Sequence, residues 1–291
     1  HPLSLLPMLR RSGYMLDVDA GKCHEHPDEF LADIHLAMSL RRQVVEYLWR
    51  REEWDVFMNV VTETDRFFHF FYEAWEDERH PRHEELLRIF AEIDDLIGFF
   101  LAHPPPGTTL EWLIVSDHGF TRMKREVYLT PLLTRAGFYA TSTPDSGDLT
   151  GISEKAKAFA LDPSRIHLHK RGVYRLGRVK PGDEGTLRRE LTDLFESLKV
   201  EGEKVVRRVF FREEIFHGRC LELAPDLVLL AEPGFDIKAG HTKSEVSAPS
   251  RFSGVHRWDN ALLFCSRPAL IPESPSVFHV RGLLEQLARP R

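Results

Sequence analysis

Two aspartates and three histidines lie next to apolar runs at three places in the chain. The sequence Ser-Asp-His-Gly-Phe at 116–120 follows the apolar run 110–115. An Asp-x-x-x-His element follows the run 56–61, and one histidine precedes the run 261–265. The residues concerned are Asp65, His69, Asp117, His118 and His256. Open α/β sheets present ligands at the carboxyl ends of their strands, so we expect these side chains to meet.

Carboxylate and imidazole groups suit zinc and similar divalent ions. Two such ions about 3.5–4 Å apart stabilise the attacking and leaving oxygens of a phosphoryl displacement. Each residue also has a structural explanation: Asp117 as the cap of a following helix, Asp65 as an N-cap, and His256 as a loop residue. Their joint occurrence favours a two-metal hydrolase site.

The composition excludes several classes of protein. The 291 residues are 42% hydrophobic and 29% charged, which is typical of a globular chain. A net charge of −6 disfavours a nucleic-acid-binding surface, although bound metal ions can supply positive charge for a phosphoester substrate. No apolar stretch reaches the ~18 residues that a membrane span requires. The three scattered cysteines favour a reducing compartment, and we expect a cytoplasmic protein.

Apolar spacing predicts the elements that position the candidate residues. We expect a short strand and turn over 13–20, a helix over 27–51, an amphipathic helix over 84–101 and a buried strand over 55–61. Residues 65–75 are predicted to be helical, which places Asp65 and His69 one turn apart on one face. Strand and helix alternate along this part, so the rhythm predicts a parallel sheet with right-handed crossovers.

The chain resembles the type I phosphodiesterase / nucleotide pyrophosphatase branch of the alkaline phosphatase superfamily. The matching pieces are Thr-Glu-Thr-Asp-Arg-Phe-Phe-His-Phe at 62–70, Ser-Asp-His-Gly-Phe at 116–120, Gly-Val-His-Arg at 254–257 and the run Ala-Pro-Asp-Leu-Val-Leu at 224–229. The resemblance implies an alkaline-phosphatase-like α/β fold: a mostly parallel sheet with helices on both faces, incomplete at its N-terminus. It implies one such domain over 1–291, with 120–220 as a candidate cap or insertion.

By this resemblance, Asp65, His69 and His256 hold one zinc ion, and Asp117 and His118 hold the other. Manganese is the alternative metal. In the family, the second zinc also binds an Asp at the end of the first strand and a nucleophilic Thr. No residue before 28 fits either role, so the nucleophile is expected upstream, where a signal sequence is also conceivable. The opening residue His1 is read as the middle of a longer protein. We therefore expect the chain alone to be inactive or nearly so.

The implied activity is metal-dependent hydrolysis of phosphodiester or nucleotide pyrophosphate bonds in a small-molecule substrate. Alternatives with the same fold are a sulfatase, a phosphomutase or a phosphonate hydrolase. A third interpretation is a non-catalytic remnant that has kept its ligands. None of the cysteines has the C/S-x-P-x-R context that a sulfatase needs.

The loops 120–150 and 232–255 are the regions where we expect substrate specificity to lie, since fold alone does not decide it. His241 in the second loop is a candidate substrate-binding residue, although a solvated histidine is the simpler interpretation. A nucleotide would need an aromatic stacking partner. The candidates are Phe120, Tyr128 and Phe235.

Overall fold

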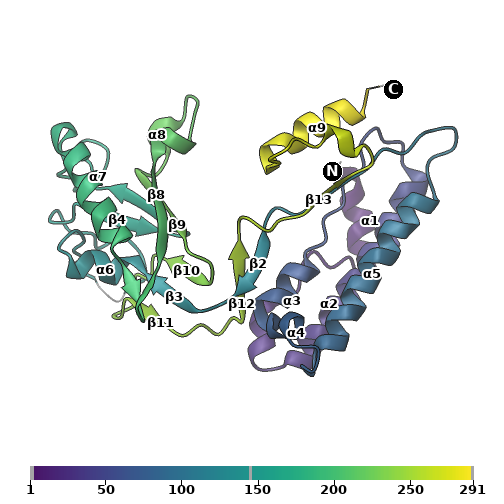
Figure 1. Cartoon of the computed structure of the whole chain (residues 1–291), viewed down its shortest axis with the longest axis horizontal. Coiled ribbons are helices and arrows are strands. Elements are labelled where there is room, and N and C mark those ends of the chain that lie inside the picture. Colours follow the sequence, from purple (N-terminus) through teal and green to yellow (C-terminus); the bar gives the residue numbers. More distant parts are fainter. Residues whose placement is uncertain (1–2, 144–145, 290–291) are drawn as a thin grey trace. The chain divides into compact units, whose positions relative to one another are not determined.

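The chain forms two compact units in the computed structural model, which describes residues 3–143 and 146–289 (Figure 1). Unit 1 comprises residues 1–121 and 252–291, and unit 2 comprises residues 122–251. All five candidate metal ligands lie in unit 1, and His241 lies in unit 2. The predicted insertion at 120–220 overlaps unit 2, and it stays a prediction.

Unit 1 is mainly helical. Its α-helices are α1 Leu6–Arg11, α2 Pro27–Arg51, α3 Glu63–Phe71, α4 Glu73–Glu76, α5 His83–Ala102 and α9 Val280–Leu287. Its 3-10 helices are η1 Leu3–Leu5, η2 Ala20–His24, η4 Pro268–Leu270 and η5 Val277–His279. Its strands form two short pairs: β1 Leu113–Val115 with β13 Leu263–Cys265, and β2 Gly119–Arg122 with β12 Gly254–Arg257.

The two long predicted helices are confirmed. Helix α2 begins with Pro27 and has acidic residues in its first turn and arginines in its last, which suits the helix dipole. Helix α5 buries Leu86, Ile89, Leu96 and Phe99, whereas Leu87 is exposed. The apolar spacing includes Leu87, so the buried face of α5 is slightly narrower than the spacing indicates. None of the helices in the described part of the chain is both long and apolar enough to cross a membrane.

Two predicted strands of unit 1 are wrong. Residues 13–20 form a turn that leads into η2, where Asp19 accepts a hydrogen bond from the Gly21 amide. Residues 55–61 are not in a strand, and Val56, Met58 and Val60 are 63%, 83% and 52% exposed. Within the described residues, no backbone hydrogen bond involves residues 53–61. An alternating apolar segment becomes a buried strand only where a neighbouring strand and a covering layer exist.

Unit 2 is an α/β layer arrangement around one core. Its helices are α6 Leu129–Arg135, α7 Pro181–Glu196, α8 Arg212–Ile215 and the 3-10 helix η3 Leu221–Leu223. Its strands are β3 Arg125–Tyr128, β4 Ala158–Leu161, β5 Arg165–Leu168, β6 Lys199–Val200, β7 Glu203–Lys204, β8 Val206–Phe211, β9 Leu227–Ala231, β10 Phe235–Lys238 and β11 Ser247–Ala248. The segment 232–255, expected to be one long loop, therefore carries short strands.

The α/β class is confirmed, but a mostly parallel sheet is not. Strands β3 and β10 pair in parallel. The pairs β1–β13, β3–β11, β4–β5, β5–β9, β6–β7 and β8–β9 are antiparallel. The repeating strand–helix rhythm predicted crossover connections. Short connections explain the antiparallel pairs β4–β5 and β6–β7, whereas the other antiparallel pairs join strands that lie further apart in the chain.

Unit 2 contains a buried carboxylate that contacts several of its segments. Asp226, 2% exposed, accepts hydrogen bonds from Lys170 Nζ at 2.6 Å, from Arg188 Nη2 at 3.1 Å and from the Leu168 amide at 2.8 Å. It also accepts one from Arg212. Burial would raise the pKa of Asp226, but the hydrogen bonds from Lys170 and Leu168 outweigh it and the pKa is lowered.

Replacing Asp226 with Asn should destabilise unit 2 by about 3–5 kcal/mol at neutral pH, because buried cations lose their counter-charge. The folded-state pKa lies below the unfolded value, so this contribution is present above about pH 4 and is lost as the pH falls through the folded pKa. Denaturant unfolding of the wild type and Asp226→Asn from pH 7 to pH 3 should show the stability gap closing in acid. The matched control is Asp193→Asn, an exposed carboxylate on α7. A gap that does not narrow at all between pH 7 and pH 3 would contradict the electrostatic explanation.

Candidate metal centre

Helix α3 supplies two of the candidate ligands. Asp65 and His69 are four residues apart, and the Asp65 Oδ1–His69 Nε2 distance is 3.6 Å. The start of the helix is anchored by a buried ion pair, in which Arg41 Nη2 of α2 donates to Glu63 Oε1 at 2.7 Å. Phe67 is fully buried on the opposite side of α3. These contacts hold the face that carries both ligands.

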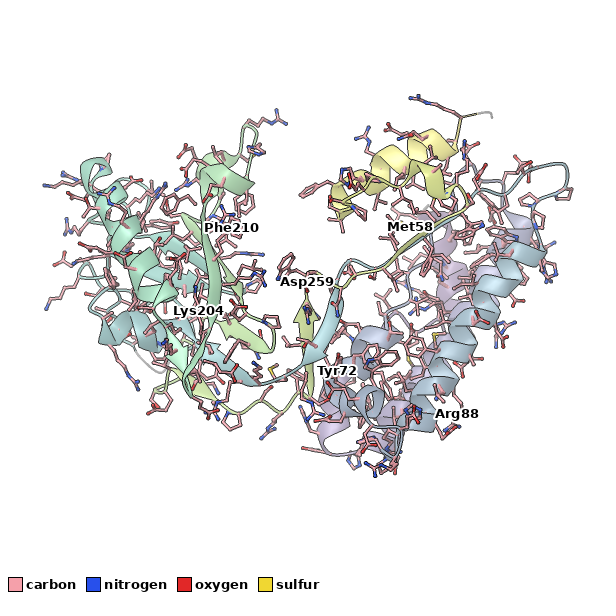
Figure 2. All side chains as sticks on the ribbon, viewed as in Figure 1. Met58, Tyr72, Arg88, Lys204, Phe210 and Asp259 are labelled. Atoms are coloured by element: carbon pink, nitrogen blue, oxygen red, sulfur yellow. The ribbon has the colours of Figure 1, made fainter. Side chains whose placement is uncertain are left out.

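The other candidate ligands lie around the strand pair β2–β12. His118 directly precedes β2, and His256 lies in β12. Helix α3 packs against β12: the Tyr72 amide donates to Ser253 Oγ at 2.7 Å, and Figure 2 shows Tyr72 at the end of this helix. The Ser253 amide in turn donates to the His69 carbonyl at 2.8 Å. Both hydrogen bonds meet at Ser253, so the C-terminal end of α3 is joined to the start of β12.

Backbone carbonyls orient two of the imidazole rings. His69 Nδ1 lies 3.2 Å from the Gly254 carbonyl, and His118 Nδ1 lies 3.1 Å from the Gly119 carbonyl. A carbonyl only accepts, so each Nδ1 carries the proton and each Nε2 presents a lone pair. Metal-binding histidines are commonly fixed in this way.

The free nitrogen atoms converge on one carboxylate oxygen. His256 Nε2 lies 3.0 Å from Asp65 Oδ1 and 3.0 Å from His69 Nε2. His118 Nε2 lies 3.7 Å from Asp65 Oδ1. Tetrahedral ligands at zinc bond lengths of ~2.0–2.1 Å stand about 3.3 Å apart. The donor types and their separations fit a divalent metal ion.

Asp117 lies outside this convergence. Its side chain is 86% exposed, and its Oδ1 lies 3.6 Å from His118 Nε2. The donors of Asp65, His118 and His256 all lie within 4.8 Å of one another, and neither Asp117 nor His69 is in that group. The division of the five residues between two ions therefore stays a prediction.

The protonation states suit metal binding. Burial would raise the pKa of Asp65, but the hydrogen bond with His256 and the neighbouring charges of His69 and Arg66 lower it. Burial lowers the pKa of His69 and outweighs the opposite effect of Asp65. At neutral pH the carboxylate is therefore ionised and the His69 ring is neutral, which are the forms that bind a metal ion.

Phe120 forms an apolar wall against the imidazole rings. Its ring centroid lies 5.0 Å from that of His69, 5.1 Å from that of His256 and 5.5 Å from that of His118. The sequence suggested Phe120, Tyr128 and Phe235 as stacking partners for a nucleotide. That interpretation is wrong for all three, because they are 9%, 3% and 5% exposed and already packed.

Some residues that shape the candidate metal centre could not be identified from the sequence. A Cβ atom on Gly254 would lie 2.3 Å from the Phe68 carbonyl oxygen, so only glycine allows β12 to approach α3 this closely. Phe252 packs on His69 at 5.3 Å. In the sequence, Gly254 was the one local indication of this close approach. Its contact residue Phe68 lies 186 positions away, and no sequence pattern connects the two.

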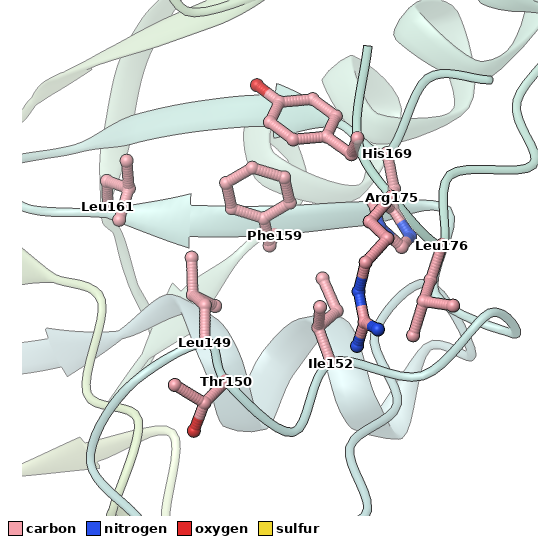
Figure 3. Close-up of a pocket in the computed structure, with 9 residues that line it drawn as sticks. Leu149, Thr150, Ile152, Phe159, Leu161, His169, Arg175 and Leu176 are labelled. Carbon is pink, nitrogen blue, oxygen red and sulfur yellow. The ribbon is translucent and has the colours of Figure 1, made fainter. Parts of the chain in front are cut away.

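His241 and a pocket lined mainly by apolar side chains belong to unit 2. Thr130 Oγ1 lies 3.3 Å from His241 Nδ1, and burial lowers the pKa of this histidine. A cavity of about 380 Å³ is lined mainly by apolar side chains such as Leu149 and Phe159, with Arg175 extending along it (Figure 3). Its lining residues bring no cluster of metal ligands together. The substrate-binding role of His241 stays a prediction.

The comparisons with known proteins gave matches of two kinds. A sequence model of the type I phosphodiesterase / nucleotide pyrophosphatase family matches residues 11–259. No curated protein gives a significant match. Two crystal structures of phosphonoacetate hydrolase from Sinorhizobium meliloti 1021, with phosphonoacetate and with phosphonoformate, are 16% identical over 87% of this chain, at a TM-score of 0.46. This chain spans 57% of the length of those proteins.

Gly254→Ala tests whether the close approach of β12 to α3 assembles the centre. The added methyl group would overlap the Phe68 carbonyl oxygen, so we expect a stability loss of about 1–3 kcal/mol and weaker zinc binding. Gly98→Ala in α5 is the control: no heavy atom lies within 4 Å of its added Cβ, and helix propensity predicts a gain of up to ~1 kcal/mol. Denaturant unfolding and a zinc titration measure both effects. Zinc binding as in the wild type would refute the packing argument.

Proposed function

The chain belongs to the type I phosphodiesterase / nucleotide pyrophosphatase family, and on that premise we propose that it carries the metal centre of a phosphoester hydrolase. The proposed reaction is hydrolysis of phosphodiester or nucleotide pyrophosphate bonds at two zinc ions. The observation that supports it most is the convergence of Asp65 Oδ1 with the Nε2 atoms of His69 and His256 at 3.0–3.6 Å. Such a set of lone pairs is expensive to hold together without a cation between them.

In this proposal, Asp65, His69 and His256 hold one ion and Asp117 and His118 hold the other. Bound divalent ions supply positive charge beside a phosphate group and lower the pKa of water. Three imidazole nitrogens and a carboxylate favour zinc over manganese. The backbone carbonyls of Gly254 and Gly119 keep the Nε2 atoms of His69 and His118 directed inward.

The protein's own charge argues for this role of the metal. The chain carries a net charge of −6, and a phosphoester substrate is an anion. The cation that contacts Asp65 is Arg66, which is already paired with Asp17. The positive charge that binds the substrate therefore has to come from the ions themselves. The exposed Asp117 supports this, because a carboxylate open to solvent accepts an ion without a burial penalty.

Metal content is the direct test. The purified chain should contain about two zinc ions, as a two-ion site requires, measured by elemental analysis after removal of loosely bound metal. His256→Ala and Asp65→Asn should each lose at least one ion. Asp117→Asn should lose the second. The control is His217→Ala, an exposed histidine of unit 2. A wild type without zinc, or ligand variants with unchanged zinc, would refute the proposed metal centre.

Activity should be measured on this chain and on any longer natural polypeptide that contains it. Bis(p-nitrophenyl) phosphate and a dinucleoside diphosphate test diester and pyrophosphate hydrolysis. p-Nitrophenyl phosphate and phosphonoacetate test monoester and phosphonate hydrolysis. We expect the diester and the pyrophosphate to be the preferred substrates. A preference for the phosphonate would contradict the proposed substrate, and zinc binding without hydrolysis of any of the four would indicate a non-catalytic remnant.

A further inference from the structure

The two oxygen atoms of Asp65 have different surroundings. Oδ1 faces the imidazole nitrogens of the metal centre, the nearest being His256 Nε2 at 3.0 Å. Oδ2 accepts a hydrogen bond from Arg66 Nη1 at 3.0 Å. One oxygen is thus directed at the metal and the other at a fixed cation.

Arg66 is itself held by a second carboxylate. Its Nε donates to Asp17 Oδ1 at 2.9 Å, and its Nη2 donates to Asp17 Oδ2 at 2.5 Å. This is the paired geometry in which a guanidinium group loses most of its rotational freedom. Asp17 lies 49 positions from Arg66 in the chain, so the contact belongs to the tertiary structure.

Asp17 is fixed by its own backbone surroundings. Its Oδ1 accepts a hydrogen bond from the Val18 amide at 2.8 Å, and the Val18 side chain packs in the core of unit 1. The next acidic residue, Asp19, caps η2. The segment that directly follows Asp17 is therefore anchored.

We propose that Arg66 and Asp17 are positioning residues, which make Asp65 a ligand through Oδ1 alone by holding its Oδ2. The proposal rests on the metal centre proposed above, and neither residue is a ligand itself. Outer-sphere partners of this kind orient ligands and alter metal affinity 10–100-fold. An arginine suits the role because it stays charged at all accessible pH values and has donors for two carboxylates at once.

A purely structural salt bridge is the competing explanation. The side chains of Arg66 and Asp17 are 30% and 40% exposed, and pairs that are this open contribute about 0–1 kcal/mol to stability. Both explanations allow a small change in stability on mutation. They differ in metal binding: only the positioning role predicts a large change there.

The experiment measures zinc dissociation constants by chelator competition for Arg66→Met, Asp17→Asn and the double variant. We expect 10–100-fold weaker binding for Arg66→Met, an intermediate loss for Asp17→Asn, and a double variant no weaker than Arg66→Met alone, because the residues act in series. Arg66→Lys keeps the charge but cannot hold two carboxylates in a fork, so it should not restore the wild-type affinity.

The exposed pair Arg79–Asp77, also in unit 1, supplies matched controls. Arg79→Met and Asp77→Asn should bind zinc within about twofold of the wild type, as expected for a surface pair remote from the site. The visible absorption spectrum of the cobalt-substituted protein should change in Arg66→Met and not in the controls, since it reports ligand geometry. Melting temperatures of the metal-free proteins show whether each variant folds.

The outcomes separate the two proposals. A wild type that binds no zinc refutes the metal centre. A wild type that binds zinc, with Arg66→Met and Asp17→Asn of equal affinity and an unchanged cobalt spectrum, refutes the positioning role alone. If Arg66→Met does not fold, Asp17→Asn decides, because it preserves the shape of the side chain.

Discussion

The metal centre depends on holding lone pairs together that repel one another. Asp65 Oδ1 and the Nε2 atoms of His69 and His256 lie 3.0–3.6 Å apart. Without a cation or a shared proton between them, this arrangement raises the free energy of the folded chain. The surrounding structure therefore has to hold these atoms at short distances. Functional sites commonly lower the stability of a fold in this way.

Several packing contacts hold the candidate ligands in position. Phe120 contacts all three imidazole rings and leaves them little room to rotate. The closeness of Gly254 to Phe68 brings α3 and β12 together, and the carbonyls of Gly254 and Gly119 set the ring orientation. Removing one such support loosens ligands that it does not touch, because their positions are coupled through the backbone.

Unit 2 contains a charged cluster of a different kind. There, a single buried carboxylate, Asp226, is surrounded by the cations Lys170, Arg188 and Arg212. Each of these cations also pairs with a glutamate, Glu184, Glu213 or Glu222, so the cluster contains charges of both signs. In unit 1 a carboxylate faces imidazole nitrogens, which bring no fixed positive charge, and in the proposed function a cation completes the site. The contrast explains why one cluster is structural and the other is a candidate active site.

Local patterns in the sequence determined the long helices and pointed to the candidate metal ligands. Helices α2 and α5 follow from apolar spacing and charged ends, which act within a few residues. The Asp-x-x-x-His spacing determined that Asp65 and His69 share a helical face. The family motifs lie in the same short segments, which is why the family could be recognised before any contact was known.

Contacts between distant residues were decided only by the tertiary structure. Residues 55–61 are apolar at successive positions, as in a buried strand, but Val56, Met58 and Val60 lie exposed, since pairing depends on a partner that the pattern does not contain. The direction of strand pairing differs from expectation for the same reason. Asp17 was an unexplained acid in the sequence, and its contact with Arg66 gives it a place beside the metal centre. Helix formation depends on neighbouring residues and can be predicted from them. The convergence of residues 65, 69, 118 and 256 depends on how whole helices and strands pack.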